Sequence, residues 1–339
     1  MTYCVTQVSI ANVKVMLTFG SSRRRIAAAL AIACLGLTAA ACSSSSSSST
    51  SSPAASTPAS TAASSPAASS AAASPSSSAT GSGAVNVLYA GSLVNLITKQ
   101  VGPAFQTASG YSVTGKGAGS TALVTDIKGK IDKGDVFISA SPKATATLMG
   151  SANGDWLSWY VSFASSNVVL GYNPNSKFAA DIKSKPWYEA ITESGLKLGF
   201  TDPATDPKGK LTADALSTTA KSKNLPALTT IESDKGDVFP EETLVARLQS
   251  GQLDAAFFYT AEATAANIAT VPLTGVTEKA TYTISTLKGA PNEAGAEAFV
   301  AYLLGPSGQA FLNQDGFALI TPPKVTGSGV PSAVQSAIG

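Results

Sequence analysis

The chain has 339 residues, with 23 lysines and arginines, 21 aspartates and glutamates, and no histidine. Without histidine, the chain cannot form Ser-His-Asp or Cys-His nucleophilic centres, or zinc sites that use histidine. The formal net charge of the whole chain is +2. All 21 acidic residues but only 19 of the basic ones lie in 85–339, so the part expected to fold has a charge of −2. Its single arginine, Arg247, also argues against a nucleic-acid surface.

The first 41 residues have the pattern of a secretory signal peptide. A basic run at 23–25 precedes an apolar stretch at 26–41, and Cys42 follows directly. Cys42 resembles the lipidation site of a bacterial lipoprotein; alternatively, the signal is cut elsewhere and Cys42 is a free thiol. Because Cys4 and Cys34 would leave with the signal, the exported protein has no internal disulfide.

Residues 43–84 are almost entirely serine, alanine, threonine and proline. Such a segment buries too little apolar surface to offset the entropy of ordering, so we expect a disordered tether from 42 to 84. Random-coil scaling gives it an end-to-end distance of roughly 30–40 Å. The tether would hold the folded part away from the outer face of the cell membrane, to which lipid on Cys42 would anchor it.

From residue 85 the pattern predicts an α/β fold with a parallel sheet. Strands and helices alternate in the first third, and a glycine-rich turn at 115–119 stands between the second strand and its helix. The expected elements are strands at 85–89, 111–115 and 135–140, and helices ending near 108, 131 and 149.

Two extended runs, 160–163 and 167–172, are expected to carry the chain into a second α/β lobe. The alternating strand ATYTISTL would carry it back, two helices would follow, and the tail from Thr321 would be loose apart from a short last helix. This organisation predicts a first lobe of about 85–163 plus 286–339, a second of about 164–285, and a ligand cleft between lobes joined by two crossings.

Several loops that open helices could line this cleft. Gly91-Ser92 and Gly119-Ser120 follow strands of the first lobe, whereas 206–209 and 240–243 lie in the second, where Tyr259 ends a buried strand. Helix N-termini carry unpaired N–H groups and a partial positive charge, so together they could bind one anion. Taken singly, these residues could equally be ordinary caps, turns and a core tyrosine.

The glycine-rich stretch GKGAGS fits no nucleotide-binding pattern. The dinucleotide fingerprint needs glycine where Ser120 stands, and the phosphate loop needs Gly-Lys followed by serine or threonine. The cysteines form no CxxC metal or redox motif. No pair of carboxylates stands out, although the sequence leaves a carboxylate-based hydrolase open.

Six segments together resemble the substrate-binding protein of an ABC importer for molybdate or tungstate, nearest the archaeal-type branch. The resemblance covers nearly all of 85–339 and implies the two-lobed fold of periplasmic binding proteins. The segments are YAGSL (89–93), AGSTALVTDI (118–127), GDVFISASPKA (134–144), DPATDPKG (202–209), ETLVARLQSGQLDAAFFY (242–259) and GAPNEAGAEAFVAYLLGPSGQAFL (289–312).

The resemblance also implies which residues hold the oxyanion: hydroxyls, main-chain N–H groups at helix starts, and the hydroxyl of a strand-end tyrosine. The residues that match are Ser92, Gly119, Ser120, Asp206, Lys208, Gly209, Glu241 and Tyr259. Main-chain donors are expected at Gly119, at Lys208-Gly209 and near Glu241, and the Lys208 side chain could add positive charge at the cleft edge.

Some archaeal members add two carboxylates that bring the metal of the oxyanion to six-coordination. Asp206 matches one of them, but the other falls on Phe258, which cannot coordinate. The resemblance therefore favours a simple hydrogen-bonded tetrahedral anion in this chain.

These observations predict a lipid-anchored solute-binding protein outside the cytoplasm that passes an oxyanion to an ABC permease. It would act as a monomer, with no chemistry, cofactor, free metal ion or nucleic acid. The alternatives are the same fold binding sulfate or phosphate, a secreted carboxylate-based hydrolase, and a wall adhesion module.

Overall fold

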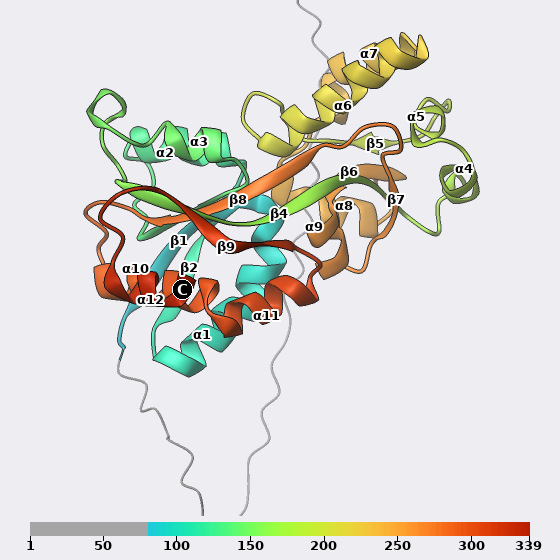
Figure 1. Cartoon of the computed structure of the whole chain (residues 1–339). Helices are drawn as coiled ribbons and strands as arrows, with labels where there is room; N and C mark the ends of the chain where they lie inside the picture. Colours follow the sequence, from blue (N-terminus) through green and yellow to red (C-terminus); the bar gives the residue numbers. More distant parts are fainter. Residues whose placement is uncertain (1–80) are drawn as a thin grey trace, which may run out of the picture. The chain divides into compact units, whose positions relative to one another are not determined.

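The computed structural model describes residues 81–339, so the expected signal peptide, Cys42 and nearly all of the tether lie outside the described residues. Strands and helices alternate, which confirms the α/β class (Figure 1). In the described part, no helix is both long and apolar enough to cross a bilayer. The strands are β1 (Ala84–Ala90), β2 (Ser112–Ala118), β3 (Val136–Ser139), β4 (Trp159–Tyr172), β5 (Leu198–Gly199), β6 (Ala255–Tyr259), β7 (Ala269–Pro272), β8 (Lys279–Thr286) and β9 (Ala318–Gly327). The helices are α1 (Gly102–Ser109), α2 (Ser120–Lys128), α3 (Pro142–Ala146), α4 (Ala179–Ser184), α5 (Trp187–Ala190), α6 (Pro207–Lys223), α7 (Ala227–Ser233), α8 (Leu244–Gln249), α9 (Thr260–Ala265), α10 (Glu293–Leu304), α11 (Pro306–Gln314) and α12 (Ser332–Ile338).

One long strand, β4, belongs to two groups of strands. Its first part pairs antiparallel with β8 and β9, and its second part, from Val168, pairs antiparallel with β6 and β7. In the first group, β1 runs parallel to β2 and β3, and β3 pairs with β8. The two extended runs expected near 160–172 are thus one strand, and the chain returns to the first group through β8. These two groups of strands form the two lobes of the fold, and β4 and β8 carry the chain between them.

Helices cover both faces of the first group of strands (Figure 1). On one face, α1 and α10 meet through Phe105 and Phe299, whose rings pack edge to face with centroids 5.2 Å apart. On the other face, Leu123 of α2 packs with Leu88 and Phe137 of the strands. Burying a large apolar side chain is worth about 1.5–3 kcal/mol, so these contacts fix where the turns after β1 and β2 lie.

The second lobe has its own apolar contacts around β6. Trp187 packs edge to face on Phe257 at 6.1 Å, and its Nε1 donates to the Thr274 carbonyl at 3.1 Å. On the opposite face, Phe258 lies in a cluster with Leu248 of α8. Phe258 is therefore a core residue, and this packing fixes the end of β6, where Tyr259 follows.

The glycine-rich stretch is mostly strand. Gly115 and Gly117 lie inside β2, so only Gly119 remains in the turn that was expected to span 115–119. A Cβ placed on Gly115 would lie 1.9 Å from the Val87 carbonyl oxygen of β1. Glycine is needed here for the close approach of two strands and not for a turn.

The C-terminal tail is ordered beyond the expected point. The prediction that it is loose from Thr321 was wrong, because 321–327 belong to β9, which pairs with β4. The last helix does form, as α12, and buries Val334 completely. The tail therefore completes the first lobe.

Candidate functional site

The turn after β1 brings Ser92 to the meeting point of the two lobes. Ser92 is buried, and its Oγ lies 3.0 Å from the hydroxyl oxygen of Tyr282 on β8. A Cβ on Gly91 would lie 2.8 Å from Oε2 of Glu241, which belongs to the second lobe. Only glycine allows the Glu241 carboxyl group to come this close to the turn.

The turn after β2 meets the second lobe in the same way. A Cβ on Gly119 would lie 2.6 Å from the Thr205 carbonyl oxygen and 3.1 Å from Oδ2 of Asp206. The N–H groups of Thr121 and Ala122, in the first turn of α2, donate to that same carbonyl at 3.1 and 3.0 Å. Part of this helix N-terminus is therefore already satisfied by the other lobe and is not open to an anion.

Ser120 holds the start of α2 against the first group of strands. Its side chain is fully buried, and its Oγ accepts a hydrogen bond from the Ala140 N–H at 3.0 Å. The hydroxyl still has its O–H to donate to a ligand.

Asp206 caps α6 and takes up the main-chain donors that were expected to face the anion. Its Oδ1 accepts from the N–H groups of Lys208 at 2.6 Å and Gly209 at 3.3 Å. This corrects the expectation that Lys208-Gly209 offers free N–H groups, and the reason is that an aspartate N-cap satisfies the first turn of its own helix. Oδ2 of Asp206 is buried and has no hydrogen-bond partner.

Lys208 lies in the interior, not at the cleft edge. Its side chain has no exposed surface, and its Nζ lies 2.7 Å from Glu262 Oε2 and 3.4 Å from Glu241 Oε1. Burial acts to lower the pKa of Lys208, but Glu262, Glu241 and Asp206 raise it above the usual value for lysine. The expectation of edge charge was wrong because the side chain turns inward to meet these carboxylates.

Glu241 presents its carboxyl group to the site, where only a main-chain donor was expected. The residue is 3% exposed, and neither carboxyl oxygen has a hydrogen-bond partner. Burial first, and then the charge of Asp206, raise the pKa of Glu241 well above the usual value for glutamate, while Lys208 acts to lower it. Glu241, and not Phe258, is thus the second carboxyl group at this point.

Tyr259 ends β6 with its hydroxyl inside the protein. The side chain is fully buried, its hydroxyl oxygen has no hydrogen-bond partner, and its ring packs edge to face on Tyr282 at 5.9 Å. Burial raises the pKa of Tyr259 well above its usual value, so the hydroxyl keeps its proton and can donate it to a ligand.

Sequence reasoning missed two residues of the site, Tyr282 and Glu262. Tyr282 occupies an inward position of the alternating strand β8, a pattern that could have marked it as buried. Glu262 stands three residues after Tyr259, the spacing of a reciprocal helix cap, and its Oε2 accepts from the Tyr259 N–H at 3.3 Å.

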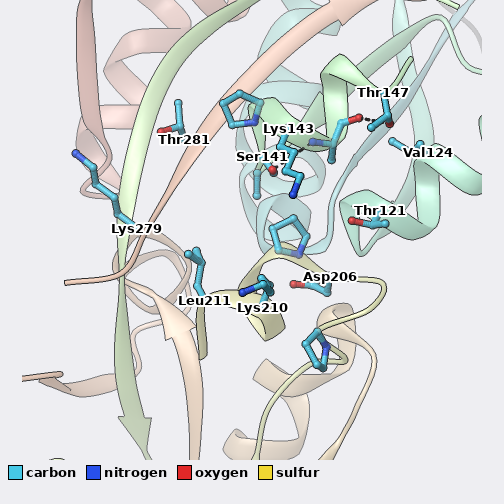
Figure 2. Close-up of a pocket in the computed structure, with 15 residues that line it drawn as sticks. Thr121, Val124, Ser141, Lys143, Thr147, Asp206, Lys210, Leu211, Lys279 and Thr281 are labelled. Atoms are coloured by element: carbon cyan, nitrogen blue, oxygen red, sulfur yellow. Dashed lines mark hydrogen bonds between the residues drawn. The ribbon is translucent and has the colours of Figure 1, made fainter. Parts of the chain in front are cut away.

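Three cavities surround these groups. A cavity of about 210 Å³ is lined by Ser92, Glu241 and Glu262, and one of about 290 Å³ by Gly119, Asp206 and Glu241. A larger one, about 390 Å³, lies between α2, α3, α6 and β8 on the other side of Asp206 (Figure 2). Its lining includes Lys143, Lys210 and Lys279, so positive charge does lie at this edge, although it does not come from Lys208.

The arrangement suits binding better than catalysis. A hydroxyl donor and two carboxyl groups without partners converge between the lobes, and the turns of the first lobe face them. Buried polar groups without partners are costly, so a ligand that pairs with them would be bound strongly. Among the described residues, no three histidine, cysteine or acidic side chains are grouped so that they could hold a metal ion.

Comparison with known proteins finds similar solute-binding proteins. An uncharacterised solute-binding protein of Petrotoga mobilis is 26% identical over 279 residues, which cover 72% of this chain and 86% of the relative. A molybdate/tungstate-binding protein of Pyrococcus abyssi is 26% identical over 273 residues, which cover 65% of this chain and 78% of the relative. Among solved structures, the periplasmic molybdate-binding protein of Azotobacter vinelandii superposes with a TM-score of 0.54 and 19% identity, covering 70% of this chain and 99% of that protein. This last likeness confirms the fold of periplasmic binding proteins.

Residues 85–318 match the family described as bacterial extracellular solute-binding protein, and this match spans most of the chain. Proteins of this family bind substrates for transporters and are not enzymes, so the hydrolase and adhesion alternatives fall away. With its two-lobed fold and the unpaired polar groups between the lobes, this chain belongs to the bacterial extracellular solute-binding protein family.

Proposed function

We propose that this protein captures molybdate or tungstate outside the cytoplasm and passes it to the permease of an ABC importer. The observation that carries the proposal is the set of buried polar atoms without partners, Asp206 Oδ2, both carboxyl oxygens of Glu241 and the Tyr259 hydroxyl. The carboxyl groups of Glu241 and Asp206 lie against the Gly91 and Gly119 turns of the first lobe, respectively. The names of the Pyrococcus and Azotobacter proteins support the same ligands.

The two carboxyl groups help to choose among oxyanions. A fully ionised oxyanion offers only acceptors, so the Ser92 and Tyr259 hydroxyls can pair with it but an ionised carboxylate cannot. Molybdenum and tungsten can add oxygen ligands beyond four, whereas the sulfur of sulfate cannot. Carboxyl oxygens of Asp206 and Glu241 without donors therefore favour molybdate or tungstate over sulfate, and they favour an expanded coordination over the simple tetrahedral anion.

Hydrogen phosphate is the second candidate, on the same observation. Its remaining proton could be donated to Oδ2 of Asp206, which has no partner. Sulfate carries no proton at neutral pH and has neither way to satisfy the carboxyl groups.

The test is calorimetric titration of the purified protein with molybdate, tungstate, sulfate and phosphate in turn. We expect dissociation constants below about 1 µM for molybdate or tungstate and much weaker binding of sulfate. Asp206→Asn should weaken binding, while Asp214→Asn, an exposed substitution on the same helix, should not. Tight phosphate binding alone would change the substrate, and no heat with any of the four would refute the proposal.

We also propose that lipid on Cys42 holds the protein at the outer face of the membrane. The proposal rests on the basic run, apolar stretch and small residues before this cysteine. Mass spectrometry of the protein from membranes should find a diacylglyceryl group on Cys42. Cys42→Ala should release the protein into the medium, and a variant that stays in the membrane would refute the anchor.

A further inference from the structure

Lys208 is a fully buried lysine in the first turn of α6 that contacts no solvent. Its Nζ donates to Glu262 Oε2 at 2.7 Å and lies 3.4 Å from Glu241 Oε1. The rings of Phe258 and Tyr259 cover it, with centroids 5.4 and 5.6 Å from Nζ. Because the surroundings are dry, its charge acts over this distance with little screening.

The charges around the site are unequal. Three buried carboxyl groups, those of Asp206, Glu241 and Glu262, act on one ammonium group, Lys208. No other lysine or arginine in 81–339 forms an ion pair with any of the three. An anion that enters beside Asp206 and Glu241 therefore meets repulsion from these carboxyl groups, which the buried Lys208 partly offsets.

The same lysine also holds the groups that face the ligand. Glu262 Oε2 accepts from Lys208 Nζ and from the Tyr259 N–H, so the pair fixes the start of α9 and the end of β6. The main-chain N–H of Lys208 donates to Asp206 Oδ1, which leaves Oδ2 facing the site. Lys208 thus connects Asp206, Glu241 and Tyr259.

We propose that Lys208 is a specificity-determining residue that shifts the preference of the site toward oxyanions with two negative charges over those with one. The inference rests on the proposed function. The attraction between a fixed positive charge and an anion scales with the anion's charge, so Lys208 contributes about twice as much to binding a dianion as a monoanion of the same shape. Its partner Glu262 acts in the opposite direction.

The experiment compares tungstate, a tetrahedral dianion, with perrhenate, a tetrahedral monoanion of similar size. The measured quantity is the ratio of the two affinities, obtained by calorimetry on the parent protein and on variants. Lys208→Met should lower the preference for tungstate by about tenfold or more, because one buried positive charge is lost. Glu262→Gln should raise this preference, because the positive charge is then less compensated.

Two further variants separate charge from structure. The double variant Lys208→Met/Glu262→Gln removes one charge of each sign, so its tungstate preference should return to within about threefold of the parent. Lys221→Met changes the net charge equally but lies exposed near the other end of α6, and the preference should not change. A residue that only maintained the fold would weaken both anions alike and would not give shifts of opposite sign.

The failures are distinguishable. A parent protein that binds tungstate, with a preference unchanged in Lys208→Met and Glu262→Gln, overturns the role of Lys208 but leaves the proposed function intact. If Lys208→Met does not fold, Glu262→Gln decides the matter, and an unchanged or lowered tungstate preference overturns the inference. A parent that binds neither anion removes the proposed function and this inference together.

Discussion

Replacing Glu241 by glutamine should stabilise the ligand-free protein while weakening its affinity for an oxyanion. The Glu241 carboxyl group is buried, neither of its oxygens accepts a hydrogen bond, and its ion pair with Lys208 is long, at 3.4 Å. Glutamine removes the charge, and its amide N–H can donate to the unpaired Oδ2 of Asp206. A site arranged to bind a ligand thus lowers the free energy of unfolding of the ligand-free protein, and the substitution removes part of this loss.

The size and pH dependence of the effect follow from the burial. Burial, then Asp206, raise the pKa of Glu241 in the folded state, so the folded protein holds this proton more tightly than the unfolded chain. The free energy of unfolding therefore falls as pH rises from the ordinary glutamate pKa of about 4.3 through the raised value, and the penalty is complete above it. A buried polar group without a partner costs about 1–3 kcal/mol, which corresponds to a rise in Tm of about 2–12 °C for a domain of this size.

The assay is thermal unfolding of the ligand-free protein at pH 5 and pH 8, followed by circular dichroism. Glu241→Gln should raise Tm, and more at pH 8 than at pH 5. Glu242→Gln, the exposed neighbour, is the control and should change Tm little at either pH. A Tm for Glu241→Gln at pH 8 that is equal to or below that of the parent would refute the reasoning.

Three further predictions concern the turns and the core. Ser92→Ala and Tyr259→Phe should each weaken tungstate binding by about tenfold or more at unchanged fold, because each removes a hydrogen bond to a charged ligand; equal affinity in calorimetry would remove both residues from the site. Gly119→Ala should oppose the approach of the two lobes, because its Cβ would lie 2.6 Å from the Thr205 carbonyl oxygen. X-ray scattering of the ligand-free variant should therefore show a larger radius of gyration than the parent, and an unchanged radius would contradict the clash. Asp135→Asn should lower the free energy of unfolding by about 1–3 kcal/mol in urea, since its buried carboxylate accepts two main-chain N–H groups at 2.7 Å; an unchanged denaturation midpoint would contradict this.

Local patterns were enough for most of the elements and for the turns that open several helices. The strand, turn and helix around Ser92 are adjacent in the chain, so their alternation and turn residues identified the turn without knowledge of the fold. The same holds for Tyr259 at the end of a buried strand, whereas the role of Asp206 as the cap of α6 emerged only from the structure. The glycine-rich stretch was misread because Gly115 is required by Val87 of the neighbouring strand, a contact that the local sequence does not contain.

The state of each polar group could not be predicted in the same way. Nothing near Glu241 in the chain shows that its carboxyl group touches Gly91, about 150 residues earlier. Likewise, Thr205 satisfies the start of α2 from the other lobe. Whether a donor is free or occupied depends on which distant atom comes within about 3 Å.

The sequence by itself predicted a secretory signal, which lies outside the described residues, and determined the α/β class and the helix-opening turns, because composition and periodicity are properties of neighbouring residues. Only the tertiary structure decided that Lys208 is buried between Glu241 and Glu262, that Phe258 is core, and that Asp206 and Glu241 keep carboxyl oxygens without partners. The physical reason is that burial and pairing are set by the packing of segments far apart in the chain. A buried glutamate without a partner costs free energy, and a ligand that pairs with it recovers that free energy.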